Sequence, residues 1–127
     1  MAINTELLVG TLQHIDHNRT EWHQSSWRAC FAGHAVILAG GRWAIPDPDH
    51  ALARVLKPVR GDRKGDVLVY GTAEGWDGPL LRGVPVPVRA RRVLGLDDMQ
   101  AKRLFCATND LPRLYTIVSD LCEEAAA

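Results

Sequence analysis

The chain has 127 residues, of which 46% are hydrophobic, and its 15 lysines and arginines balance its 15 aspartates and glutamates. This length and apolar content are those of one domain with one core, and they exclude a second domain of ordinary size. The balanced charge excludes a global field that would draw the protein toward nucleic acid or an anionic membrane.

The longest apolar run, around residues 35–41, is far shorter than a membrane span, and the first residues lack the pattern of an export signal. We therefore expect a cytoplasmic protein that makes no membrane contact. Cys30, Cys106 and Cys122 are odd in number and widely spaced, so we expect reduced thiols and no disulfide framework. Such thiols behave as small hydrophobic side chains in a core.

The first part of the chain, residues 4–57, is predicted to be helical. Asn4 is a good helix cap, and the apolar residues that follow share one face of a helix over about 5–17. A second helix is predicted from Ser26 to about Ala39 and is apolar nearly all round, so we place it, buried, at the centre of the fold. Trp22 and Trp27 flank its start and are interpreted as core side chains whose indole nitrogens bond to loop carbonyls.

The middle of the chain contains a predicted β-hairpin over about 66–88. Pro46 and Pro48 favour an extended loop over 42–49, which a short helix over 50–56 follows. Alternation then predicts strands over 66–71 and 80–88, joined by a turn over 74–78. Because Pro85 and Pro87 cannot donate ladder hydrogen bonds, the second strand is expected at an edge of a small sheet.

The C-terminal part, residues 88–125, is predicted to be a cluster of helices. Residues 88–94 end at Gly95, Asp97 and Gln100 form a capping box for a helix that reaches about Thr108, and Asp110 caps the last helix. The last helix carries an apolar stripe that packs on the chain's own core or forms a homodimer through residues 110–125. The fold class is therefore α+β, a helix-rich single domain with a buried central helix, a small hairpin and a C-terminal helical cluster.

No complete catalytic constellation is present, so no catalytic residue is assigned. The nearest approach to a site is a group in the N-terminal third, in which Cys30 and His34 lie four apart on one predicted helix and could face one point. A zinc ion there would take its ligands from His17, His23, Cys30 and His34. The alternative is that Cys30 and His34 are interior residues, with the imidazole hydrogen-bonded in the core.

Two further chemical readings remain open. Cys30 lies near the start of a predicted helix, where the dipole stabilises a thiolate, and the spacing from Gln24 is similar to that of papain-like proteases. Beyond His34, which is on the same predicted helix, the only downstream histidine is His50, and it lies in a Pro-rich loop without an orienting Asn. The helices over 88–108 resemble a helix-turn-helix in outline, with basic residues for phosphate contacts at Arg89, Arg91, Arg92, Lys102 and Arg103.

The remaining hypothesis is that the protein contacts a partner. Trp76 lies between Gly75 and Asp77 at the expected hairpin tip, where burial is least required, and it is the first candidate for contact with another protein. Arg91 and Arg92 are the accompanying candidates. Nucleic acid is retained as an alternative partner of the same arginines.

Two stretches resemble small proteins of actinobacteria and their phages. The first is Trp22-His23-Gln24-Ser25-Ser26-Trp27-Arg28-Ala29-Cys30-Phe31-Ala32-Gly33-His34-Ala35, and the second runs from Val93-Leu94-Gly95-Leu96 to Asn109. The resemblance covers about half of the chain and implies a shared fold and a phage or prophage setting rather than an activity. Members often carry a further cysteine just after the second tryptophan, where this chain has Arg28 and Ala29. We therefore expect an accessory or regulatory protein that binds a host macromolecule, most simply a protein.

Overall fold

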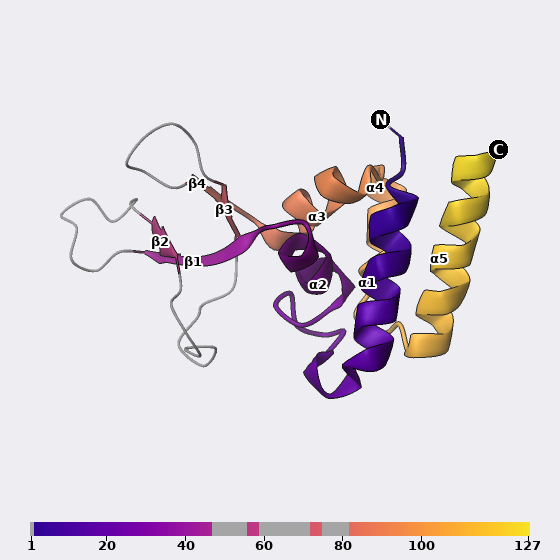
Figure 1. Cartoon of the computed structure of the whole chain (residues 1–127), viewed down its shortest axis with the longest axis horizontal. Coiled ribbons are helices and arrows are strands. Elements are labelled where there is room, and N and C mark those ends of the chain that lie inside the picture. Colours follow the sequence, from indigo (N-terminus) through magenta and orange to yellow (C-terminus); the bar gives the residue numbers. More distant parts are fainter. Residues whose placement is uncertain (1, 47–55, 59–71, 75–81) are drawn as a thin grey trace.

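The computed structural model describes residues 2–46, 56–58, 72–74 and 82–127. The helices gather at one end of the molecule and the strands at the other, and both termini lie at the helical end (Figure 1). The expectation of a helix-rich domain is confirmed. In chain order the elements are α1 (Thr5–His17), the 3-10 turn η1 (Arg19–Glu21), α2 (Phe31–Leu38), β1 (Arg42–Pro46), β2 (Leu56–Pro58), β3 (Thr72–Glu74), β4 (Arg82–Val84), α3 (Val86–Leu94), α4 (Asp98–Leu104) and α5 (Leu111–Ala126).

The first helix has the predicted bounds. The Asn4 side chain accepts a hydrogen bond from the backbone N–H of Leu7 at 3.0 Å, which satisfies one of the N–H groups that a helix start leaves without a partner. One face of α1 is buried, and on it Thr11 bonds its hydroxyl to the carbonyl of Leu7 at 2.7 Å. This face packs against α2 and α5.

The second helix is shorter than the sequence predicts. It begins at Phe31, because the backbone of Cys30 is extended (φ −79°, ψ −178°) and Ser26 and Ala29 belong to the turns that precede it. Phe31 and the side of α2 that faces α1 and α3 are buried, whereas Ile37 and Leu38 are 41% and 45% exposed. The expected start at residue 26 was therefore wrong, whereas the expectation that most sides of this helix are covered is confirmed.

A glycine sets how closely α2 packs on the turn before it. A Cβ atom at Gly33 would lie 2.5 Å from the carbonyl oxygen of Arg28, closer than real Cβ contacts come. The helix therefore lies directly on the backbone of residues 27–28. Arg28 in turn places its guanidinium 6.0 Å from the ring centre of Trp43 at the start of β1.

Four short strands pair antiparallel in the order β2-β1-β3-β4 among the residues that can be described. Ala44 pairs with Pro58, Trp43 with Thr72, and Ala73 with Gly83. Residues 42–46 were expected to be a loop, so β1 is a correction. It arises because residues far along the chain supply its hydrogen-bonding partners. The predicted strand over 66–71, the turn with Trp76 and nearly all of the short helix over 50–56 lie outside the described residues.

The predicted strand over 80–88 ends early. Strand β4 stops at Val84, and α3 begins at Val86 with Pro87 in its first turn. A proline fits there, because the first turn of a helix does not use its N–H groups for helical hydrogen bonds. The prolines that were expected to disturb a strand instead mark the start of a helix.

The C-terminal helices follow the predicted caps. Gly95 ends α3 with φ 68°, in the left-handed region that favours glycine, and Asp97 with Gln100 forms the predicted capping box of α4. Helix α4 ends at Leu104 rather than near Thr108. The Asn109 side-chain amide donates to the carbonyls of Arg103 and Leu104 at 2.9 and 3.0 Å, which satisfies the carbonyls left by that early end.

The apolar stripe of α5 packs against other helices of the same chain. Leu114, Ile117, Val118 and Leu121 are buried, and α5 packs against α1 and α4. Of the two readings of this stripe, the one in which it packs on the chain's own core is confirmed. None of the helices in the described part of the chain combines the length and the apolar character needed to cross a membrane.

Candidate functional site

The proposed zinc ligands are not brought together. His17, at the end of α1, places its Nδ1 atom 2.7 Å from the carbonyl of Gln13, and His23 is exposed in the following loop. His34 places its Nε2 atom 3.2 Å from the carbonyl of Glu21. Within the described ranges, no three side chains of His, Cys, Asp or Glu are close enough together to hold a metal ion.

Cys30 lies in the core, and His34 on α2 is partly buried beside it. Cys30 is 1% exposed, and this burial raises the pKa of its thiol. Burial also lowers the pKa of His34, whose ring centre lies 5.2 Å from that of His14 on α1. Both side chains are thus neutral near neutral pH, as burial favours. A nucleophilic cysteine would instead need to be a thiolate.

A groove of about 430 Å³ opens between the turn before α2, helix α3 and helix α4. Its apolar lining consists of Trp27, Pro87, Val88, Ala101 and Phe105. Trp27 is 43% exposed and meets the ring of Phe105 edge-on, with ring centres 6.3 Å apart and planes 88° apart. The interpretation of Trp27 as a buried core residue was therefore wrong, since the helix that would have buried it begins only at Phe31.

Gln24 fixes the position of this groove's aromatic wall. Its side-chain oxygen accepts from the indole N–H of Trp22 at 3.0 Å and from the backbone N–H of Phe31 at 3.1 Å. Its side-chain nitrogen donates to the carbonyls of Leu104 and Cys106 at 3.1 and 3.2 Å. One buried amide thus joins the turn that carries Trp27 to the end of α4, beside Phe105. The indole of Trp22 was expected to bond to a loop carbonyl and bonds instead to this side chain.

Basic side chains border the groove. Arg91 on α3 forms an ion pair with Asp98 at 3.4 Å, and both line the groove together with the exposed Lys102. No acidic side chain in the described part of the chain forms an ion pair with Lys102. Of the three residues proposed for partner contact, Arg91 therefore lies at the groove, Arg92 is exposed on the same helix, and Trp76 is outside the described residues.

A second groove of about 320 Å³ continues from the first one along the far side of α4. The two share Lys102 and Cys106, and the second adds Met99, Arg103 and Arg113. The side chain of Arg103 pairs with Asp120 and Glu124 on α5, whereas no ion pair involves Arg113 among the described residues. The combined lining contains four cations, Arg91, Lys102, Arg103 and Arg113, and one acid, Asp98.

Cys106 is an exposed thiol where the two grooves meet. Its Sγ atom lies 3.2 Å from the hydroxyl oxygen of Thr108, and hydrogen bonding to Thr108, with Arg113 nearby, lowers the thiol pKa. Cys106 and Cys30 were both expected to pack as small hydrophobic residues, so the exposure of Cys106 is a correction. The polar run Cys106-Ala107-Thr108-Asn109-Asp110 is the signal that could have indicated an exposed loop.

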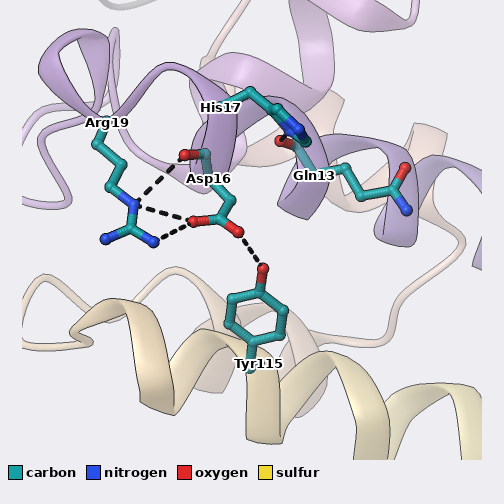
Figure 2. Close-up of polar contacts among 5 residues, drawn as sticks. All are labelled: Gln13, Asp16, His17, Arg19 and Tyr115. Carbon is teal, nitrogen blue, oxygen red and sulfur yellow. Dashed lines mark hydrogen bonds and ion pairs between the residues drawn. The ribbon is translucent and has the colours of Figure 1, made fainter.

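A separate polar cluster joins α1 to α5 on another part of the surface. Figure 2 shows Asp16 between Arg19 and Tyr115, with the tyrosine hydroxyl donating to Asp16 at 2.6 Å. Arg19 bonds to the same carboxylate and to the carbonyl of Asp16. The tyrosine hydrogen bond, followed by that of Arg19, lowers the pKa of Asp16. These contacts link the two helices.

The helices proposed for DNA binding have the expected order but a short second member. Helices α3 and α4 are joined by residues 95–97, and α4 has seven residues, or about two turns.

Comparisons with protein-family models, curated proteins and solved structures found no significant match for this chain.

Proposed function

We propose that this protein is a non-enzymatic accessory or regulatory protein that binds another protein through the groove between Trp27, α3 and α4. The observation that carries the proposal is the 43% exposure of Trp27, beside Phe105, in a concave and mainly apolar site. Large aromatic side chains in such sites are the usual anchors of protein interfaces, because they bury much apolar area and have few rotatable bonds to order.

The construction of the groove supports the same proposal. Pro87, Val88 and Arg91 lie on one face of α3, while Ala101 and Phe105, four residues apart, lie along one side of α4 and its end. Two helix faces that line an apolar groove can accept an amphipathic segment of a partner. Gln24 already holds the aromatic wall in place, so binding needs little ordering of that wall.

The thiols also favour binding over catalysis. Cys30 is buried and protonated, and Cys106 bonds to Thr108 rather than to a histidine that could act as a base. A thiol or zinc enzyme at Cys30 and His34 therefore has less support than a binding role.

The resemblance to small proteins of actinobacteria and their phages makes a host protein, met in the cytoplasm, the partner that we propose. For the fold, we propose the α+β class with a hairpin over about 66–88, which the pairing of β3 with β4 supports. A homodimer through residues 110–125 has less support, because the apolar stripe of α5 is buried within the chain.

DNA is the second candidate partner. Lys102 and Arg113 lie near the joined helices α3 and α4 without ion-pair partners among the described residues, as phosphate contacts would require. Against it, Arg103 is paired with acids of α5 and the entire chain has no net charge. The apolar lining is also of more use to a protein partner than to a phosphate backbone.

The proposal is tested by selecting peptides from a random library on the full-length protein and measuring their affinity by fluorescence anisotropy. Trp27→Ala should weaken the selected peptides by about 2 kcal/mol or more, as loss of an interface anchor does. Tyr115→Ala is the matched control, because Tyr115 is 44% exposed but lies against α1. Peptides that bind both variants alike, or no selected peptides at all, would contradict the assignment of the groove.

A further inference from the structure

We infer that the segment bound in this groove is acidic, with an apolar anchor for the Trp27–Phe105 wall and carboxylates for Lys102 and Arg113. This inference rests on the proposed function, since it names the chemistry of the partner at the same groove. It follows from the charges around the two adjoining grooves rather than from the charge of the chain.

The chain is neutral in total, but its charges are not evenly spread over this surface. The adjoining grooves are lined by four cations and by Asp98 as the one acid. Asp98 already pairs with Arg91 at 3.4 Å, and Arg103 already pairs with Asp120 and Glu124. Lys102 and Arg113 form no ion pair among the described residues, so they are the positive charges that a partner could neutralise.

Lys102 lines both grooves. A segment anchored on Trp27 would therefore meet Lys102 on α4 first and then Arg113 at the start of α5. Carboxylates on the partner fit this arrangement, whereas lysines or arginines would place like charges together and be rejected. The apolar wall supplies most of the affinity and the basic border supplies selectivity for acidic partners.

An acidic protein segment is favoured over nucleic acid by the composition of the surface. The wall of Trp27, Pro87, Val88 and Phe105 is apolar, and a duplex backbone offers little to bury against it. Two cations without ion-pair partners would neutralise few phosphates, so duplex DNA would bind weakly and with a shallow salt dependence. Duplex DNA and a second copy of the chain are therefore treated as competing occupants in the test.

The test uses the peptides selected on the full-length protein and reads their net charge. We expect acidic peptides with at least one large apolar residue, bound about fivefold more weakly by Lys102→Glu and by Arg113→Glu. Arg42→Glu is the control, because Arg42 is exposed on β1, away from both grooves, and the substitution makes the same change of charge. Increasing salt should weaken binding to the wild-type protein more than binding to Lys102→Glu.

The outcomes separate this inference from the proposed function. Neutral or basic peptides that still depend on Trp27 would overturn the acidic partner and leave the protein-binding groove in place. An absence of Trp27-dependent peptides would overturn both. A labelled random-sequence duplex that binds with a steep salt dependence, lost in Lys102→Glu, would replace the acidic segment with DNA. Self-association of the pure protein that is lost in Trp27→Ala would replace it with a second copy.

Discussion

Trp22 and Trp27 lie in the same loop between α1 and α2 and have different environments. Trp22 is partly buried against the core, and its indole N–H is bonded to Gln24. Trp27 is 43% exposed and contacts Phe105 at the edge of the groove. Two residues of the same type in one loop therefore have different roles. Because α2 begins only at Phe31, the helix does not cover Trp27, which lies on the groove side of the Gln24 hydrogen bonds, whereas Trp22 lies on the core side.

If this comparison is correct, changes on the Trp22 side should reduce stability and changes on the Trp27 side should reduce binding. The largest effect is expected for Phe31→Ala, at about 3–5 kcal/mol of unfolding free energy, because Phe31 is fully buried. Urea denaturation measures it. Leu38→Ala, on the same helix but 45% exposed, should cost less than about 1 kcal/mol. Equal losses in the two variants would contradict the described orientation of α2.

Gln24→Leu should be the next most damaging change, at about 2–3 kcal/mol. It leaves the buried backbone N–H of Phe31 and the indole N–H of Trp22 without the oxygen that accepts from them, and it removes the donor to the carbonyls of Leu104 and Cys106. Gln24→Glu separates the two halves of this contact, since it keeps the acceptor for Phe31 and removes the donor to the carbonyls. Denaturation of both variants measures the difference. A wild-type stability for Gln24→Leu would show that this amide does not hold the loop to α4.

The pH dependence of stability should reveal the burial of His34. Its folded-state pKa is lowered below 6.5, so the unfolded chain takes up the proton more readily than the folded protein. The contribution of His34 is thus complete above pH 6.5 and is lost as the pH falls from 6.5 toward the folded-state pKa. The free energy of unfolding, measured by urea denaturation at several pH values across this range, should depend less on pH in His34→Gln than in the wild-type protein. A wild-type protein that becomes more stable as the pH falls through this range would contradict the lowered pKa of His34.

Trp27→Ala should have a smaller effect on stability, below about 1 kcal/mol, because much of the ring is already in contact with water. Its thermal unfolding, compared with that of Trp22→Ala, tests the comparison directly. A loss as large as that of Trp22→Ala would mean that Trp27 supports the core after all.

The smallest effect is expected at the cluster in Figure 2. Tyr115→Phe removes the hydroxyl that donates to Asp16, so the pKa of Asp16 should rise toward its ordinary value of 3.8. The stability that this carboxylate provides is lost as the pH falls through its folded-state pKa, and the variant should lose it at a higher pH. Carboxyl NMR shifts during an acid titration follow this change. An unchanged Asp16 pKa would show that Arg19 alone accounts for it.

Local signals predicted much of the helical part. Asn4, Gly95, Asp97 and Asp110 act at helix ends over a few residues, so their caps were visible in the sequence and agree with the structure. The apolar stripe of α5 was likewise a local pattern. The homodimer alternative remained open only because a stripe does not say which surface covers it.

The errors arose where distant residues decide the structure. Residues 42–46 form a strand because residues 56–58 and 72–73 pair with them, which no local pattern shows. The turn before α2 is held by a hydrogen bond from Gln24 to the carbonyl of Leu104. The sequence does not show this bond, so the segment from residue 26 was predicted to be one continuous helix. The groove was missed for the same reason, since Trp27 meets Phe105 only when that turn is in place.

The most direct test is an amide NMR titration of the full-length protein with a peptide selected on it. We expect the shifts to concentrate at residues 27–30, in the first turns of α3 and around Lys102 and Phe105, and we expect Trp27→Ala to remove them. Shifts centred on the α1–α5 side around Tyr115, or shifts that persist in Trp27→Ala, would contradict the claim that the groove is the binding surface.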